Sequence, residues 1–237
     1  MKAMILAAGL GQRMRPLTDN LPKPMLPVVG KPLLQYHLEA LQSAGVTEVV
    51  INLSYLGEKI RHFVGDGRRF GLNVQYSSEP ELLETGGGVL KALPLLGEAP
   101  FLLINGDVWS EFNYTDLLTR NLQREKLGHL VLVPNPEFHP RGDFAFRRDG
   151  ILLNEDISAP RFTFSGISII TPALIANYPH ARAKFPLVEA LRAAIIHEQL
   201  TGEVYEGTWS DIGTPERLTA LEQQLMAKRD QVSILKS

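Results

Sequence analysis

The start of the chain constrains the fold more than any other feature of the sequence. Residues 2–8 form a near-continuous apolar run that ends in glycines, which is typical of a parallel strand covered on both faces. Residues 9–32 then carry early glycines and repeated prolines, and prolines forbid the interior of a helix because they lack the backbone donor. The sequence therefore predicts a chain that begins inside a sheet and continues into a long ordered loop.

Strand and helix patterns alternate from this loop to residue 133. Short units of this kind, joined by modest loops, favour a right-handed, mainly parallel sheet between layers of helices. The predicted strands are 48–53, 72–76, 101–105 and 130–133, and the predicted helices are one from residue 32 to a stop at Gly45, one through 56–64, one that ends near residue 93, and one over 114–124.

The second half of the chain has a different pattern. Asp149-Gly150 lies between two β-prone segments, which is a strong hairpin signal, and residues 162–170 form a longer β run. These segments predict a small β insertion beside the main sheet. Helices are predicted near 186–197 and 214–228, the last with Thr214 as its N-cap and Pro215 at its first position. The predicted fold class is α/β.

Composition excludes several kinds of partner. The 237 residues, of which 44% are hydrophobic, are enough for one domain over residues 1–237. A formal net charge of -2 gives no positive field for nucleic acid or an anionic membrane, and no stretch approaches the roughly 20 apolar residues of a membrane-spanning helix. The chain has no cysteine, which fits a reducing compartment. We therefore expect a cytoplasmic protein with no nucleic-acid, membrane or obligate protein partner.

The segment Leu6-Ala-Ala-Gly-Leu-Gly-Gln-Arg-Met14 places two glycines after the first predicted strand, where an open α/β sheet binds its ligand. Glycine N–H groups can approach phosphate oxygens, small Ala7 and Ala8 leave room for a flat base, and Arg13 supplies a planar donor. The alternative is an ordinary tight turn with solvated arginines. A dinucleotide-binding loop is disfavoured, because Met14 replaces the third small residue and a Pro-rich segment follows.

Further motifs lie along nearly the full length of the chain. They are residues 6–18 with Pro22-Lys-Pro-Met-Leu-Pro27, Glu84-Thr-Gly-Gly-Gly88, Asn105-Gly-Asp107, Phe164-Ser-Gly166 and Trp209-Ser-Asp-Ile-Gly-Thr214. Together they resemble the motifs of the sugar-1-phosphate nucleotidyltransferases. The resemblance implies a three-layer Rossmann-like nucleotidyltransferase fold, a nucleoside triphosphate and a sugar 1-phosphate as substrates, and Mg²⁺ as cofactor.

The resemblance also implies which residues bind the nucleotide. Lys23 lies between two prolines, so its backbone is stiff and its ammonium can face a triphosphate, although alone it would be an ordinary solubilising charge. Thr85 and the following glycines begin a helix whose free N–H groups suit a base edge, or else form a simple cap. The expected nucleotide-binding residues are Leu6, Ala7, Ala8, Gly9, Gly11, Gln12, Arg13, Lys23, Glu79, Thr85, Gly86, Asn105 and Asp107.

Asp107 and Asp211 are the expected metal ligands. Each accompanies a predicted strand, and both are expected at the carboxyl edge of the sheet, although either could simply end a strand or begin a helix. Two carboxylates together with substrate phosphates suit the octahedral oxygen coordination of Mg²⁺. The expected catalytic residues are Arg13, Lys23, Asp107 and Asp211.

The β insertion is expected to receive the sugar phosphate. By analogy with the family, the residues that bind it are Gly142, Asp143, Glu155, Ser165 and Gly166. Family members usually have a Glu-Lys pair near Glu155, whereas this chain reads Asn-Glu-Asp-Ile over residues 154–157.

The expected reaction is in-line attack of the sugar phosphate on the α-phosphorus of the nucleoside triphosphate, with release of pyrophosphate. The segments 84–88, 104–109 and 141–144 most resemble family members that use UTP and N-acetylmuramate 1-phosphate in peptidoglycan recycling. The alternatives are mannose 1-phosphate with GTP and glucose 1-phosphate with UTP or dTTP. A non-catalytic nucleotide-sensing domain and a Rossmann oxidoreductase are more distant alternatives.

Overall fold

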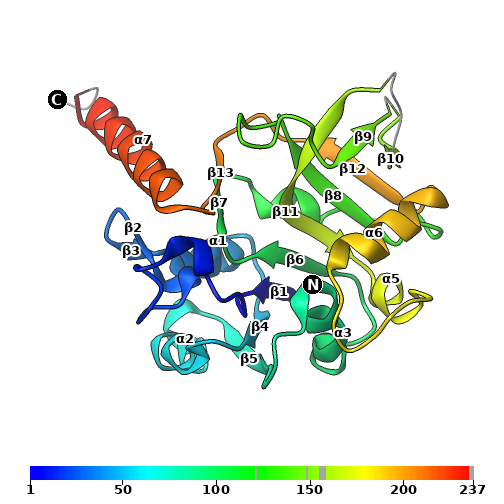
Figure 1. Cartoon of the computed structure of the whole chain (residues 1–237), viewed down its shortest axis with the longest axis horizontal. Coiled ribbons are helices and arrows are strands. Elements are labelled where there is room, and N and C mark those ends of the chain that lie inside the picture. Colours follow the sequence, from blue (N-terminus) through cyan, green and yellow to red (C-terminus); the bar gives the residue numbers. More distant parts are fainter. Residues whose placement is uncertain (121, 148, 155–158, 235–237) are drawn as a thin grey trace.

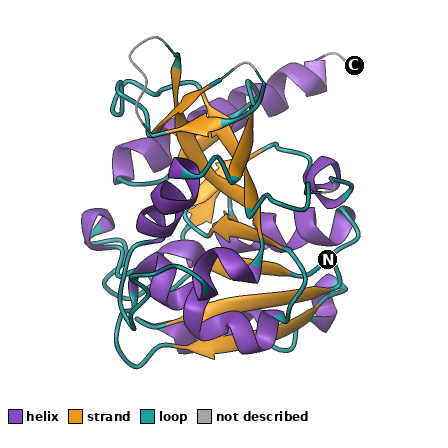
Figure 2. Ribbon diagram, turned by 90° about the vertical axis from the view of Figure 1, so that its right-hand side faces the viewer, coloured by secondary structure: helices purple, strands orange, loops and turns teal. Residues whose placement is uncertain are grey.

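The computed structural model describes residues 1–120, 122–147, 149–154 and 159–234. Within these residues nine strands form one sheet in the order β10-β9-β11-β6-β1-β4-β5, with β8 against β11 and β12 against β8. Helices lie on both sides of this sheet (Figures 1 and 2), so the predicted α/β class is confirmed. The strands are β1 Ala3–Leu6, β2 Pro27–Val28, β3 Lys31–Pro32, β4 Glu48–Leu53, β5 Asn73–Ser78, β6 Phe101–Asn105, β7 Val108–Ser110, β8 Gly128–Val133, β9 Phe144–Phe146, β10 Leu152–Leu153, β11 Arg161–Ile170, β12 Leu200–Val204 and β13 Trp209–Asp211.

The first half of the sheet is parallel, as the sequence predicts. Strand β1 pairs in parallel with β4 and with β6, and β4 pairs in parallel with β5. Strands β4 and β6 have the predicted bounds. The helices are α1 Leu33–Ser43, α2 Gly57–Val64, α3 Glu84–Leu96, α4 Tyr114–Leu118, α5 Pro172–Ala176, α6 Leu187–Ile196 and α7 Pro215–Ile234, with 3₁₀ helices at Gln12–Met14, Lys23–Met25 and Arg68–Phe70.

Alternate residues of the central strands enter two different hydrophobic cores. In β1, Ala3 and Ile5 pack with α1 and α2, whereas Met4 packs with α3 and α6. All three are 0% exposed, because side chains alternate across a strand and helices cover both faces. This two-sided burial explains why the run at the start of the chain is apolar without interruption.

The β run near 162–170 is part of the main sheet, so the prediction of a separate insertion is wrong for this strand. Strand β11 pairs antiparallel with β6 on one side and with β8 on the other. Ile167 and Ile169 enter one core and Ile170 the other, which is how an inner strand buries its side chains. The predicted hairpin at Asp149-Gly150 is formed by β9 and β10, which extend this end of the sheet.

Other differences concern short elements. Helix α4 ends at Leu118 rather than at residue 124. At the observed end, the Thr119 hydroxyl donates to backbone carbonyls of the last turn. The sequence did not predict α5, β12 or β7, and of the small sheet of β7 and β13 it indicated only a short strand before Asp211. Helix α7 begins as predicted, with the Thr214 hydroxyl 3.4 Å from the Arg217 N–H, and extends away from the body of the molecule (Figure 1). No helix among the described residues is both long and apolar enough to span a bilayer.

Candidate active site

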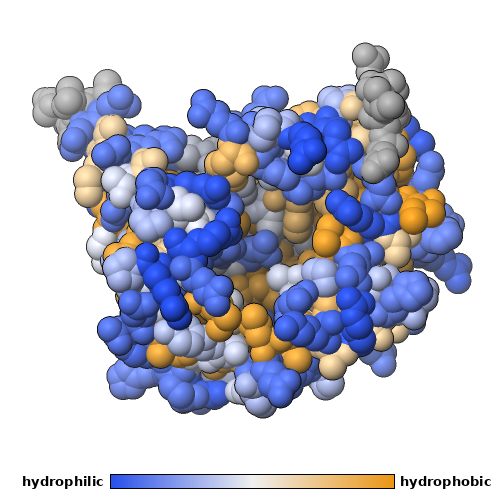
Figure 3. All heavy atoms as spheres, viewed as in Figure 1, coloured by the Kyte–Doolittle hydropathy of each residue, from blue (hydrophilic) through white to orange (hydrophobic). Residues whose placement is uncertain are grey.

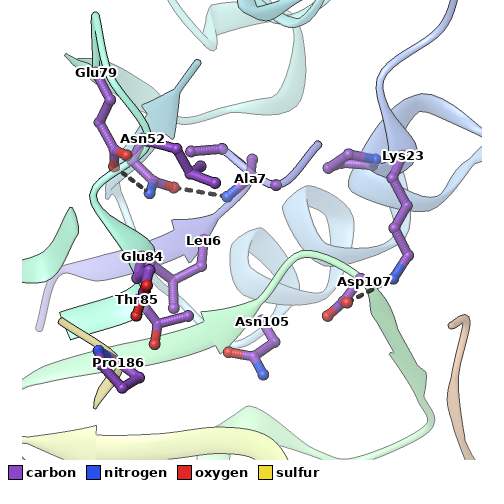
Figure 4. Close-up of a pocket in the computed structure, with 14 residues that line it drawn as sticks. Leu6, Ala7, Lys23, Asn52, Glu79, Glu84, Thr85, Asn105, Asp107 and Pro186 are labelled. Carbon is purple, nitrogen blue, oxygen red and sulfur yellow. Dashed lines mark hydrogen bonds and ion pairs between the residues drawn. The ribbon is translucent and has the colours of Figure 1, made fainter. Parts of the chain in front are cut away.

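The parallel strands end at one level, and a cavity of about 390 Å³ lies there. Leu6 at the end of β1 is in register with Asn52 of β4 on one side and with Asn105 of β6 on the other. The same face of the molecule is hollowed near its middle (Figure 3). The lining, much of it shown in Figure 4, consists of Leu6, Ala7, Ala8, Gly9, Lys23, Pro24, Asn52, Glu79, Leu82, Glu84, Thr85, Asn105, Asp107 and Pro186.

One end of this first cavity is fixed by a buried chain of hydrogen bonds (Figure 4). The Asn52 side chain accepts a hydrogen bond from the Ala7 N–H at 2.6 Å and donates one to Glu79 Oε1 at 2.7 Å. Glu79 Oε2 also accepts from the Leu83 N–H at 3.2 Å. Both linking side chains are buried, so the end of β1, strand β4 and the approach to α3 are held together. Asn52 was not among the predicted site residues. A polar residue near the end of an otherwise apolar strand is the sequence signal that could have indicated it.

The other end of the first cavity carries an ion pair. Lys23 Nζ lies 2.6 Å from Asp107 Oδ2, and the Lys23 side chain is only 10% exposed. Asp107 follows Gly106, whose N–H donates to the Leu6 carbonyl at 2.9 Å. A Cβ atom at Gly106 would lie 2.6 Å from that carbonyl oxygen, so only glycine permits this turn between β6 and β7. Sequence and structure therefore agree in placing Lys23 and Asp107 in one site.

Asp211 reaches the same place through the small sheet of β7 and β13. These strands pair antiparallel with Asp211 opposite Val108, and the Ile212 N–H donates to the Asp107 carbonyl at 3.0 Å. Burial, and then the nearby charge of Asp107, raise the pKa of Asp211, while Lys23, Arg217 and Arg13 oppose the rise. The expected convergence of two aspartates more than a hundred residues apart is thus present in the fold.

A second cavity of about 350 Å³ opens beside the two aspartates. Arg217, in the first turn of α7, donates to Asp211 Oδ2 at 2.8 Å, and its guanidinium carbon lies 3.3 Å from the centroid of the Phe138 ring. No sequence motif pointed to Arg217. The lining consists of Arg13, Asn105, Asp107, Val108, Phe138, His139, Asp143, Thr163, Phe164, Ser165, Trp209, Asp211 and Arg217.

The donor set at the aspartates fits a hard divalent cation. Carboxylate oxygens are the ligands that Mg²⁺ prefers, and it commonly takes one or two of them with substrate phosphates. Burial first, and then the charge of the neighbouring Asp107, raise the pKa of Asp211, and a divalent charge beside the two carboxylates would stabilise their ionised form. Asp107 and Asp211 are therefore the residues that would hold Mg²⁺.

The expectation of free N–H groups at the start of α3 is wrong for Gly86 and Gly87. The N–H groups of Gly86 and Gly87 both donate to the Phe185 carbonyl, at 2.9 and 3.1 Å. The glycines instead permit close packing, because a Cβ at Gly87 would lie 2.2 Å from the Ala183 carbonyl oxygen and one at Gly86 would lie 2.4 Å from the Phe185 ring. Thr85 lines the first cavity, and its hydroxyl oxygen accepts the Leu187 N–H at 2.8 Å.

The expected sugar-phosphate residues are divided. Asp143 and Ser165 line the second cavity. The Ser165 hydroxyl is engaged by the Val131 carbonyl and the Ile167 N–H, so it holds the irregularity in β11. Gly166 does not line this cavity but gives room to Asn105, whose side-chain atoms lie 2.8 Å from where a Cβ would be.

The remaining expected residues lie outside these linings. Gly142 adopts φ 58°, and a Cβ there would lie 2.5 Å from Asn135 Oδ1, so its role is in the shape of the loop. Gly11, with φ 63°, packs against Thr18, and Gln12 is exposed at the start of a 3₁₀ helix. Glu155 lies outside the described residues.

Known proteins resemble this chain over most of its length. The N-acetylmuramate alpha-1-phosphate uridylyltransferase of Neisseria meningitidis serogroup B is 44% identical over 221 residues, which are 92% of this chain and 95% of that protein. The protein of the same name from Caulobacter vibrioides is 33% identical over 94% of this chain and 96% of that one. The mannose-1-phosphate guanylyltransferase catalytic subunit beta of Danio rerio is 31% identical over 98% of this chain and 66% of that protein.

Solved structures share the fold. A protein of Bacillus anthracis described as a glucose-1-phosphate thymidylyltransferase superposes with a TM-score of 0.83 over 94% of each chain, at 19% identity. HddC from Yersinia pseudotuberculosis has a TM-score of 0.75 and 26% identity over 94% of this chain and 99% of that one. The family model of the nucleotidyl transferases matches residues 2–142. With the relatives and the site in agreement, the chain belongs to the nucleotidyl transferase family.

Proposed function

We propose that the chain transfers uridine monophosphate from UTP to N-acetylmuramate 1-phosphate, giving UDP-N-acetylmuramate and pyrophosphate. The observation that carries this proposal is the 44% identity to a uridylyltransferase of that substrate over 92% of the chain. Because N-acetylmuramate is a sugar of the cell wall, the reaction belongs to the recycling of peptidoglycan in the cytoplasm.

The two cavities suit the two substrates. The first cavity has a neutral and acidic end at Asn52 and Glu79 and a basic end at Lys23, which suits a base at one end and a triphosphate at the other. The second cavity brings Arg13 and Arg217 beside the two aspartates, which suits a sugar 1-phosphate. Both cavities share Asn105 and Asp107, so the two substrates would meet there.

The reaction needs position and charge neutralisation more than proton transfer. An oxygen of the sugar phosphate forms a bond to the α-phosphorus as the bond from that phosphorus to the bridging oxygen of pyrophosphate breaks. The attacking phosphate is ionised at neutral pH, so no general base is required. Lys23, Arg13 and Arg217 would offset the negative charge that gathers at the junction of the cavities.

We propose Mg²⁺ as the cofactor, held by Asp107 and Asp211. When bound, it would neutralise phosphate charge and act as a Lewis acid on phosphoryl oxygen. Lys23 forms an ion pair with Asp107, and Arg217 forms one with Asp211. Binding of the ion and the triphosphate would leave these two cations available to phosphate oxygens.

The direct test is a turnover assay with Mg²⁺, five nucleoside triphosphates and a panel of sugar 1-phosphates, with the products identified by mass spectrometry. We expect UDP-N-acetylmuramate as the main product. Faster formation of GDP-mannose, the product expected of the guanylyltransferase relatives, would overturn the substrate assignment. Asp107→Asn should lower turnover at least about 10²-fold, the scale of losing one preorganised charge at the reacting phosphate, with an unchanged circular dichroism spectrum.

A further inference from the structure

A third, apolar cavity adjoins the two described above and has no part in the assignment so far. Its volume is about 160 Å³, and it lies between β9, β11 and the start of α6. Five apolar side chains line it, those of Phe144, Phe164, Leu187, Val188 and Leu191. Its polar lining is Thr85, Asn105 and Asp143.

These polar residues connect the third cavity with the other two. Thr85 and Asn105 also line the first cavity, and Asn105, Asp143 and Phe164 also line the second. The third cavity is therefore next to the junction where, on the proposed function, the sugar ring of the acceptor would lie. None of the basic residues of the second cavity belongs to the lining of the third.

The apolar lining is formed by the fold and is accessible from one edge. Phe144, Leu187 and Leu191 are at most 4% exposed, so their positions are fixed by the core around them. Val188, on the outer side of α6, is 36% exposed. The Leu187 N–H bonds to Thr85 Oγ1 at 2.8 Å, which fixes the start of α6 against the nucleotide side of the site.

Such a cavity distinguishes sugars by their substituents. A ring hydroxyl placed in it would lose its water without gaining a partner on the apolar side, which opposes binding. A methyl group placed there would be removed from water, which favours binding. Sugar 1-phosphates that carry only hydroxyl groups are thus disfavoured relative to those that carry an acyl or lactyl group.

We infer that the third cavity is a subsite for a methyl-bearing acyl substituent of the acceptor sugar, an inference that rests on the proposed function. N-acetylmuramate offers two such groups, the acetamido group and the lactyl ether. Asn105 at the rim would face the amide or carboxyl part of the substituent, and the apolar residues would contact its methyl group. The Asp143 oxygens are held by His139 and the Phe164 N–H.

The test uses Val188→Phe, which fills the cavity from its exposed edge, and Val188→Thr, which adds a hydroxyl at nearly constant shape. Ile196→Phe is the matched control, because Ile196 lies on the same helix, is 72% exposed and is outside the cavity lining. Calorimetry would give dissociation constants for N-acetylmuramate 1-phosphate, N-acetylglucosamine 1-phosphate and glucose 1-phosphate, each with Mg²⁺ and a non-hydrolysable UTP analogue present.

We expect Val188→Phe to weaken the binding of N-acetylmuramate 1-phosphate about 10- to 100-fold, and Val188→Thr to weaken it less. Glucose 1-phosphate and the UTP analogue should bind to both variants as they bind to the wild type. An equal loss for N-acetylglucosamine 1-phosphate would assign the cavity to the acetamido group, and no loss for that sugar would assign it to the lactyl ether. The inference is overturned if the Val188 variants change no sugar's affinity, or change all three by one factor. A wild-type chain that makes no UDP-N-acetylmuramate would refute the proposed function separately, since these affinities need no turnover.

Discussion

Charge at single residues is the basis of the proposed site. Lys23 and Arg217 each neutralise one aspartate, and the two pairs meet where β7 and β13 come together. Lys23, Asp107 and Asp211 could be predicted because each belongs to a recognisable motif. Arg217 could not, because an arginine in the first turn of a helix is ordinary, and its pairing with Asp211 and its contact with the Phe138 ring become visible only in the fold.

Buried His37 gives a prediction about pH. It is 3% exposed on α1, and burial lowers its pKa from 6.5 to about 4. Below pH 6.5 the unfolded chain gains a proton at this residue that the folded chain does not take up until about pH 4. The free energy of unfolding should therefore decrease as the pH is lowered from 6.5 to about 4, by up to about 3 kcal/mol in total.

Urea unfolding from pH 7.5 to pH 4.5 checks this prediction in the wild type, His37→Gln and His62→Gln. The His37→Gln chain should lose much of the pH slope, because the residue no longer titrates. His62 is exposed on α2, so His62→Gln should keep the slope of the wild type. An unchanged slope in His37→Gln would show that other groups cause the acid destabilisation.

Short elements that depend on distant partners decide where the site forms. Strands β4 and β6 were predicted at their observed bounds, because a long apolar run with turn residues on both sides indicates where a strand begins and ends. Strands β7 and β13 are three residues each and are stable only as a pair. The sequence therefore indicated a short strand before Asp211 but neither β7 nor the pairing of the two strands. Their pairing nevertheless carries Asp211 to Asp107, and the sequence pointed to that contact only through the family motifs.

The glycines that begin α3 give a prediction at this scale. Alanine favours a helix over glycine by about 1 kcal/mol, so Gly87→Ala would stabilise an isolated helix. In this fold the new Cβ would lie 2.2 Å from the Ala183 carbonyl oxygen, and such overpacking costs about 1–3 kcal/mol. We expect a net loss in the free energy of unfolding of up to about 2 kcal/mol in chemical denaturation.

Gly9→Ala is the control for this substitution, because a Cβ at Gly9 has no neighbour within 4 Å. Its stability should stay within about 0.5 kcal/mol of the wild type. If Gly87→Ala proved as stable as Gly9→Ala, the close approach of α3 to residues 183–185 would not be the reason for the glycine.

The whole molecule joins two differently built halves around one site. The parallel half supplies the residues at the ends of β1, β4 and β6, and the half built around β11 supplies Asp143, Phe164 and Ser165. The sequence predicted the parallel half well, because its strand and helix periods alternate regularly. The sequence prediction placed β11 beside the sheet rather than within it. The pairing of β6 with β11 joins residues far apart in the chain, so no local sequence pattern predicts it.

Ligand binding should therefore stabilise the whole fold. At a hundred times its dissociation constant, a ligand that binds only the folded chain adds about 2.7 kcal/mol, or roughly 5–10 °C in the melting temperature of a chain of this size. UTP with Mg²⁺ should produce such a shift in scanning calorimetry, and UTP with EDTA a smaller one. Equal shifts under both conditions would count against a metal that bridges the protein and the triphosphate.

In the proposed site, Asp107 and Asp211 together hold one divalent cation beside the triphosphate. Electron paramagnetic resonance with UTP present would measure the affinity for Mn²⁺ in the wild type, Asp107→Asn and Asp211→Asn. Glu216→Gln is the control, because Glu216 is a carboxylate at the start of α7 that lines neither cavity. We expect each aspartate variant to bind Mn²⁺ at least about 10-fold more weakly while it unfolds as the wild type does, and Glu216→Gln to bind normally. Wild-type Mn²⁺ affinity in the Asp211→Asn chain would contradict the account.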